Sequence, residues 1–403
     1  MLMPQSGNAQ RRTCRMRRTY RMRRTYWMRR TLALLGSLCL FLSAIEYIIP
    51  KPLPFMRIGL ANLPLLLALD LFGPLDFFLL VLIKVLGQGI LSGSLFSYVF
   101  LLSLAGTVSS AALMYCLRKL PGKKYSGFAG IGCAGAMASN AVQLLLAQHL
   151  IFGVSIQYLA PPFLASGFIT GIALGVFCEM FCQRSQWYAR NKGQRTKDKE
   201  QGTIENEDLV VRINEGDRLT QKPDGASTSK REELRVLRRE RWQKLFSTPL
   251  LFSFGAIMAA ALIFSPSAIL RAAIFLVLCI LAWVSGKKTN IIITISVMAS
   301  IVLFNLLVPY GKVLMDIGSL HITQGSLLLG IRKALILEGL VLLSGICIKS
   351  DLRLPGKFGL LLALSFSLLE KMREHKNTIR PSRIIEGIDC LLMDLEADSV
   401  LDQ

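Results

Sequence analysis

The sequence is poor in the residues that most catalytic sites need. Its 403 residues include 3 histidines, His149, His321 and His375, which lie too far apart to predict a histidine metal site. It also has no Gly-x-x-x-x-Gly-Lys-Ser/Thr phosphate loop, no His-Glu-x-x-His, no Gly-x-Ser-x-Gly and no Asp-Asp-x-x-Asp. The sequence therefore predicts no enzyme, no catalytic residue, no metal and no other cofactor.

Charge is also scarce, and it is unevenly spread. Charged residues make up 18% of the chain, against about 25% in soluble domains. The net charge of +21 comes from basic residues that flank hydrophobic runs, which argues against a nucleic-acid partner. The 9 cysteines are an odd number, and most lie in or beside apolar runs, so we expect small hydrophobic side chains rather than a disulfide framework.

Long apolar runs fill the space between the charged stretches. A hydrocarbon core of about 30 Å is crossed by roughly 20 apolar helical residues, and backbone in lipid must satisfy its own hydrogen bonds. We therefore predict an all-α, polytopic transmembrane protein with six plus four spans. The predicted spans are 31–49, 58–72, 74–91, 95–117, 126–152 and 160–183, then 248–265, 268–284, 289–308 and 325–348.

Basic residues predict the orientation. With the arginine-rich N-terminus inside, the basic clusters near residues 118, 184, 287 and 349 all follow even-numbered spans and fall on the same side. This favours a bacterial inner-membrane protein with both termini in the cytoplasm. The predicted parts are a basic tail 1–30, a six-helix domain 31–183, a charged linker 184–247 with a basic amphipathic helix at 229–245, a second membrane domain 248–370 and a cytoplasmic tail 371–403.

Residues 11–30 repeat a six-residue unit that begins with Arg-Arg and ends in Met in its first three copies. Two interpretations stay open. The repeats lie on anionic headgroups, or translation starts at Met16, Met22 or Met28 and the upstream copies are not part of the protein.

Polar residues at membrane depth are the candidates for a binding site, because ionisable groups are costly there. Two of them are charged, a few lie in the turn-forming segments 50–62 and 91–97, and two lie one helical turn apart on the fifth span. The predicted substrate-binding residues are Glu46, Asn62, Lys84, Ser92, Ser94, Asn140 and Gln143. The alternatives are interfacial exposure for Glu46, snorkelling for Lys84, and hydrogen bonds between helices for Asn140 and Gln143.

The motifs Ala33–Ser37, Ile58–Asn62, Leu91–Ser97 and Ala138–Gln143, in this order and with Glu46 between the first two, resemble the Gx transporter family. That family is also catalogued as heptaprenyl diphosphate synthase component I. It is similar to the six-helix, substrate-binding S-components of energy-coupling-factor vitamin transporters, and the resemblance covers about 30–184. The resemblance implies that Ala33 and Ser37 form a small-xxx-small face that docks on a membrane T-component. The corresponding helix of S-components usually has alanine at the position of Ser37.

Residues 246–370 are similar to T-components. The segment Ile322–Leu335, with Arg332 and Lys333 as docking residues, is like the one that leads to their coupling region, and 349–370 would be a cytoplasmic amphipathic helix. The resemblance implies uptake of a small-molecule substrate, with membrane lipids and separate ATPase subunits as partners. The paired Ala-Arg-small motifs that contact such ATPases do not occur after Glu370. The alternative is a non-transport accessory protein for prenyl-lipid or cofactor metabolism.

Overall fold

The computed structural model describes residues 27–46, 59–119, 127–201, 238, 248–286, 291–317, 320–347, 356–374 and 383–401. Residues 11–26 of the basic repeats, residues 50–58 of the turn-forming segment 50–62 and, apart from residue 238, the amphipathic helix expected at 229–245 lie outside these ranges. The described part is almost entirely helical, which confirms the predicted all-α class. The exception is an antiparallel hairpin of β1 (Val313–Ile317) and β2 (Leu320–Thr323), which the sequence did not predict.

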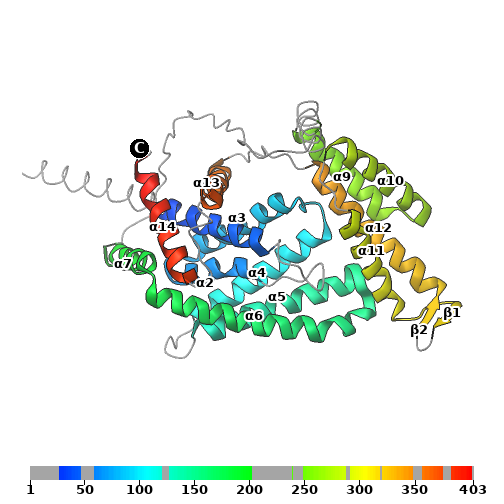
Figure 1. The fold of residues 1–403 in the computed structure, drawn as a ribbon, viewed down its shortest axis with the longest axis horizontal. Helices are drawn as coiled ribbons and strands as arrows, with labels where there is room; N and C mark the ends of the chain where they lie inside the picture. Colours follow the sequence, from blue (N-terminus) through cyan, green and yellow to red (C-terminus); the bar gives the residue numbers. More distant parts are fainter. Residues whose placement is uncertain are drawn as a thin grey trace, which may run out of the picture.

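The first bundle begins with an N-terminal helix, Trp27–Glu46, and ends with α7, which continues α6 beyond a break at Ser185 (Figure 1). Its other elements are η1 (Leu60–Asn62), α2 (Leu63–Leu71), α3 (Pro74–Ser92), α4 (Tyr98–Lys119), α5 (Phe128–Ala147), η2 (Gln148–Phe152), η3 (Gly153–Ser155), α6 (Ile156–Arg184) and α7 (Gln186–Gln201). The second bundle and the C-terminal helices are α9 (Thr248–Phe264), α10 (Ala268–Val284), α11 (Ile291–Leu306), α12 (Gln324–Cys347), α13 (Gly356–Glu374) and α14 (Ile384–Leu401).

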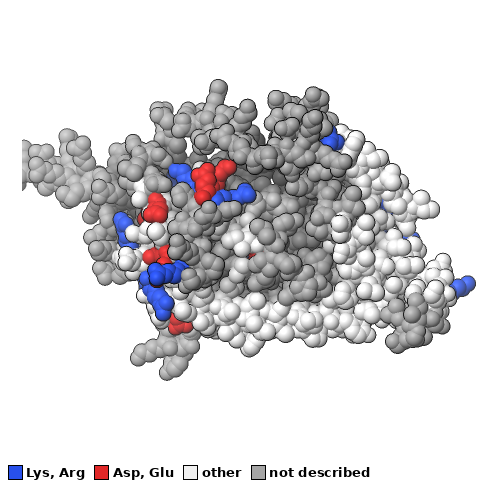
Figure 2. Space-filling model, viewed as in Figure 1, with Lys and Arg blue, Asp and Glu red and all other residues white. Residues whose placement is uncertain are grey.

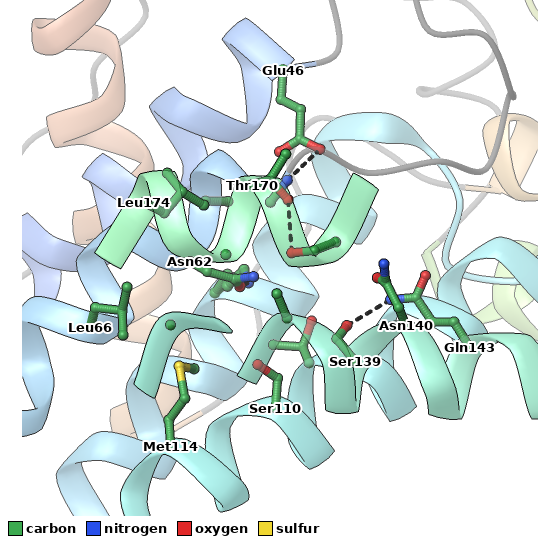
Figure 3. Close-up of a pocket in the computed structure, with 18 of the residues that line it drawn as sticks. Glu46, Asn62, Leu66, Ser110, Met114, Ser139, Asn140, Gln143, Thr170 and Leu174 are labelled. Carbon is green, nitrogen blue, oxygen red and sulfur yellow. Dashed lines mark hydrogen bonds between the residues drawn. The ribbon is translucent and has the colours of Figure 1, made fainter. Parts of the chain in front are cut away.

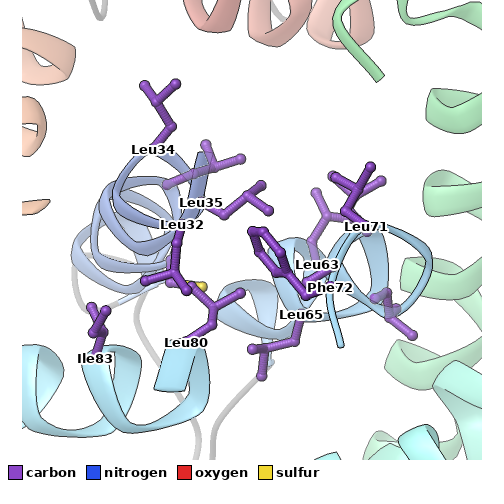
Figure 4. Close-up of a cluster of buried hydrophobic side chains, with 14 of the residues drawn as sticks. Leu32, Leu34, Leu35, Leu63, Leu65, Leu71, Phe72, Leu80 and Ile83 are labelled. Atoms are coloured by element: carbon purple, nitrogen blue, oxygen red, sulfur yellow. The ribbon is translucent and has the colours of Figure 1, made fainter. Parts of the chain in front are cut away.

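The N-terminal helix is the centre of the first bundle. Leu35 and Leu38 on this helix are 0% exposed, and they belong to a cluster that includes Leu65 of α2 and Leu80 of α3. In Figure 4, Leu35 of the N-terminal helix and Leu80 of α3 lie toward Phe72, which follows α2. Because the cluster is apolar on every side, the helix is held by packing rather than by hydrogen bonds.

One end of the first bundle, which we name the inner end, gathers the chain segments predicted to be cytoplasmic. Arg118 at the end of α4 binds Asp70 at the end of α2 through two bonds, of 2.6 and 2.8 Å. The Arg118 guanidinium also lies over the ring of Phe128, 4.6 Å from its centroid, and Trp27 donates to Asn191 of α7 at 2.7 Å. Burial raises the pKa of Asp70, but the hydrogen bonds and charge of Arg118 outweigh it and leave that pKa below its usual value.

The described helices include fewer candidate membrane spans than the sequence predicts. By length and composition, four helical runs could cross a membrane: Trp27–Glu46, Pro74–Ser92, Tyr98–Lys119 and the 57-residue run Phe128–Arg184 that holds α5 and α6. The count of ten is therefore not confirmed. Helix α2 has 9 residues and is about 14 Å long, and α9, α10 and α11 have 16 or 17 residues, which gives about 25 Å.

The surface nevertheless suits a lipid environment. Large apolar side chains such as Leu75, Ile169, Ile257 and Ile269 are 66–85% exposed. In Figure 2 charged side chains gather near α7, α13 and α14, and the described surface of the second bundle is almost free of charge. Exposed apolar area of this extent marks contact with lipid or with other proteins.

The segment predicted as a C-terminal tail contains helix α14, which packs against the inner end of the first bundle. Leu391 and Leu392 of α14 are buried in the same cluster as the N-terminal helix. Asp389 accepts hydrogen bonds from the backbone amides of Gln186 and Trp187, both at 3.1 Å, and so caps the N-terminus of α7. The C-terminal residues thus join the two halves of the chain.

The packing of α5 against α6 can be tested by substitution, because glycines let the backbones of these two helices come into contact. A Cβ atom added to Gly132 of α5 would lie 2.8 Å from the carbonyl oxygen of Gly171, whereas one added to Gly130 would meet nothing within 4 Å. We expect Gly132→Ala to lower the unfolding free energy by about 1–3 kcal/mol, and Gly130→Ala to leave it unchanged or raise it by about 0.5–1 kcal/mol. Thermal unfolding in detergent measures both, and equal effects would contradict the close α5–α6 contact.

Candidate functional site

A polar cavity lies inside the first bundle, between the N-terminal helix and helices α2 to α6 (Figure 3). Five of the seven predicted binding residues line it: Glu46, Asn62, Lys84, Asn140 and Gln143. The space is small, with about 50 Å³ open to the centre of a water-sized sphere. Since one water needs about 10–15 Å³ on this scale, the cavity has room for a few waters or a small polar group.

Two charged side chains of the cavity are almost fully buried. Glu46 and Lys84 are each 3% exposed. The Lys84 Nζ atom donates a hydrogen bond to Asn62 Oδ1, and the Gly59 amide donates to Glu46 Oε1 at 3.2 Å. Because a buried charge is tolerated only when it is paired or hydrogen-bonded, these contacts are what keep both groups inside the bundle.

The turn before α2 positions these contacts. Gly59 has a left-handed backbone, with φ of 85°, and its carbonyl accepts a bond of 2.8 Å from the Asn62 amide. A residue with a side chain rarely adopts this conformation. The turn brings Asn62 to Lys84 and leaves the Gly59 amide free to meet Glu46.

On the wall of the cavity formed by α5 and α6, the amide nitrogens and the threonine hydroxyl donate hydrogen bonds to other protein atoms. Asn140 Nδ2 donates to the Phe163 carbonyl at 2.8 Å, and Gln143 Nε2 donates to Ser139 Oγ at 2.8 Å. The hydroxyl of Thr170 donates to the Ser166 carbonyl at 2.9 Å. Asn140 therefore makes the bond between helices that the sequence left open as an alternative, while it also lines the cavity.

Ser92 and Ser94 are placed elsewhere. Their hydroxyls are 2.7 Å apart at the C-terminal end of α3, and Ser92 also donates to the Gln88 carbonyl at 2.8 Å. Neither residue lines the cavity, so the structure does not bring them to the other five. The chain turns at Gly93, where φ is 66°, so Ser92 ends α3 and Ser94 follows the turn.

Sequence reasoning missed polar residues on α3 and α4. Gln88 lies one turn after Lys84 on α3, and Thr107 and Ser110 lie one turn apart on α4. The spacing from Lys84 to Gln88 was the available signal. Serine and threonine are common at contacts between membrane helices, so the α4 pair could not be singled out.

The residues predicted to dock a partner contact the second half of this chain. The hydroxyl of Ser37 approaches Met372 Sδ at 3.6 Å, and a Cβ on Gly36 would lie 2.9 Å from Ser365 Oγ. Helix α13 therefore packs along the face of the N-terminal helix that contains the buried Ala33. Lys333 Nζ donates to Asn305 Oδ1 of α11 at 3.3 Å, and it would lie 3.5 Å from a Cβ on Gly153. Arg332 lies beside it on α12 and has a buried Nε atom without a hydrogen-bond partner among the described residues.

A comparison with known protein families separates the two halves of the chain. Residues 35–181 match the family described as heptaprenyl diphosphate synthase component I, and residues 249–350 match a domain of unknown function (DUF8519). Each match covers less than half of the chain. No curated protein and no solved structure gives a significant match.

The described cavity residues offer hydrogen-bonding groups. Among them, no group of three or more His, Cys, Asp or Glu side chains is placed to hold a metal ion. The first family's description names a component of a synthase, and the cavity offers one carboxylate, one ammonium group, amides and hydroxyls. These groups can orient a small molecule through hydrogen bonds.

The Lys84–Asn62 bond predicts a measurable coupling. We expect Asn62→Leu and Lys84→Met each to lower the unfolding free energy by about 1–3 kcal/mol, because each leaves its buried partner with one bond fewer. The double variant should lose about 0.5–3 kcal/mol less than the sum of the two. Thermal or denaturant unfolding in detergent gives all four values.

A control cycle uses Leu82, which is 41% exposed on the same helix as Lys84. Asn62→Leu combined with Leu82→Met should be additive within about 0.5 kcal/mol. Additivity in both cycles would mean that the contribution of Lys84 to the unfolding free energy does not depend on Asn62.

Proposed function

We propose that residues 31–183 bind a small molecule in the membrane and that the second half of the chain serves its uptake, in the manner of an energy-coupling-factor transporter. The observation that carries this proposal is the polar cavity enclosed by an apolar bundle. A bundle with a purely structural role is more stable with apolar residues at its centre than with an ion pair or amides. Glu46 and Lys84 are each 3% exposed, Asn62 is half-buried, and all three line one cavity. Polar and charged side chains gathered in this way are what a binding site within a membrane bundle requires.

The contact between the two halves supports a reorientation of the first bundle. We name the end opposite the inner end the outer end. The loop after α3, at the outer end, meets the end of α12 that is predicted to be cytoplasmic: the Phe96 amide donates to Ser344 Oγ at 3.2 Å, and a Cβ on Gly93 would lie 3.7 Å from Gly345 Cα. Two bundles that stand upright side by side would instead align outer end with outer end.

Further along its length, α12 again contacts the outer end of the first bundle. Ala334 and Leu337 of α12 pack in one apolar cluster with Leu102, Leu144 and Ile151 from the outer end of the first bundle. In Figure 1 α12 lies across the ends of α4, α5 and α6. If α12 crosses the membrane, the first bundle lies on its side, and its cavity faces a different direction from that in an upright bundle. A change between these two orientations would carry a bound molecule inward.

The family description supports a second candidate function. Similarity over residues 35–181 to a component of heptaprenyl diphosphate synthase favours an accessory role in prenyl-lipid metabolism. Affinity purification of the full chain from its native membrane distinguishes the two. Coupling ATPases in the eluate favour uptake, and prenyl synthase subunits favour the accessory role.

The binding proposal predicts a molecule retained on purification. Native mass spectrometry of the full chain in detergent should detect one bound species that is neither lipid nor detergent. Thr107→Leu fills the cavity wall and should lower its occupancy at least about tenfold, because the added atoms occupy the space of the ligand. Val108→Leu is the matched control, since the neighbouring Val108 is 41% exposed and does not line the cavity.

Equal occupancy in both variants would place the molecule outside the cavity. A wild-type chain with lipid alone, under conditions in which it elutes as one folded species, would contradict the proposed function.

A further inference from the structure

The two walls of the cavity differ in how their polar groups are satisfied. On the α5 and α6 wall, the amide nitrogens of Asn140 and Gln143 and the hydroxyl of Thr170 all bond to protein atoms. On the opposite wall, Gln88 Oε1 of α3 and Ser110 Oγ of α4 are buried, and neither has a hydrogen-bond partner among the described residues. Both residues line the cavity.

A buried oxygen without a partner is uncommon, because its desolvation is not compensated. Ser110 is 1% exposed, so bulk solvent does not reach it. Figure 3 shows its hydroxyl directed from α4 toward the space below Asn62. Two such oxygens on neighbouring helices, facing one cavity, point to a polar group that both of them contact when the site is filled.

We infer that Gln88 and Ser110 are the residues that recognise the ligand, and that the ligand is a net-neutral molecule with a hydroxyl or amide group. This inference rests on the proposed binding function and assigns its specificity to the α3–α4 wall. The residues predicted on α5 then shape the cavity, while their amide nitrogens remain bonded within the protein.

The charge of the cavity sets the class of ligand. Among the residues that the structure describes, its lining contains one acidic and one basic side chain, Glu46 and Lys84, whose charges cancel. A ligand with a net charge would bring an uncompensated charge into a bundle of low dielectric constant. A side-chain amide and a hydroxyl can each donate and accept, which matches a hydroxyl or amide group and leaves the overall charge at zero.

Apolar replacements of similar shape test this assignment. In native mass spectrometry of the full chain, Gln88→Leu and Ser110→Ala should each lower the occupancy of the retained molecule at least about fivefold. The melting temperature of the emptied protein should stay equal or rise, because each change removes an unpaired buried oxygen. Ser109→Ala is the matched control and should keep the molecule, because Ser109 precedes Ser110 on α4, donates to the Ala105 carbonyl and does not line the cavity.

The outcomes separate the inference from the proposal beneath it. If wild type and both variants retain the molecule equally, Gln88 and Ser110 contact water only, and the inference is overturned while the binding function stands. If the retained molecule proves to be an anion or cation, the assigned ligand class is overturned. If the wild type retains nothing beyond lipid and detergent, the proposed function fails, and the inference fails with it.

Discussion

The contact between Ser344 of α12 and the Phe96 amide after α3 is the constraint on which the arrangement of the whole chain depends. It joins the predicted cytoplasmic end of one membrane bundle to the outer end of the other. With α12 held there, α13 can lie along the side of the N-terminal helix at Gly36 and Ser37. The first bundle is thus held at its outer end by α12 and along its side by α13.

The inner end is held as well, by α14. Asp389 caps α7, and leucines of α14 enter the cluster that surrounds the N-terminal helix. A bundle contacted at three places by the second half of its own chain cannot exchange freely with other partners. The face of Ala33 and Ser37, which the resemblance predicts to dock on a T-component, is covered by α13 from the C-terminal half of this chain.

The sequence predicted the part of the site that depends on rare residue types. Glu46 and Lys84 stand out because charges are scarce in apolar runs, and Asn140 and Gln143 because their spacing puts them on one helix face. It could not predict Gln88 and Ser110, since only tertiary packing decides which of many small polar side chains lack a partner. Ser92 and Ser94 lie outside the cavity that the other five residues line, and hydropathy alone could not predict where the end of α3 places them. The membrane-depth argument predicted the helical class, whereas its count of ten spans is not confirmed, since described helices such as α2 and α9 are shorter than a full crossing.

A disulfide cross-link measures the central contact most directly. Cysteines placed at Phe96 and Ser344 in the full chain, oxidised in native membranes, should give one intramolecular linked peptide pair in mass spectrometry. A control pair at Leu75 and Ser344 should give none, because Leu75 begins α3 at the opposite end from Phe96. If the Phe96–Ser344 pair stays unlinked under oxidation that links Gly255→Cys to Cys347, whose sulfur would lie 2.9 Å from a Cβ at Gly255, the two halves do not meet as described.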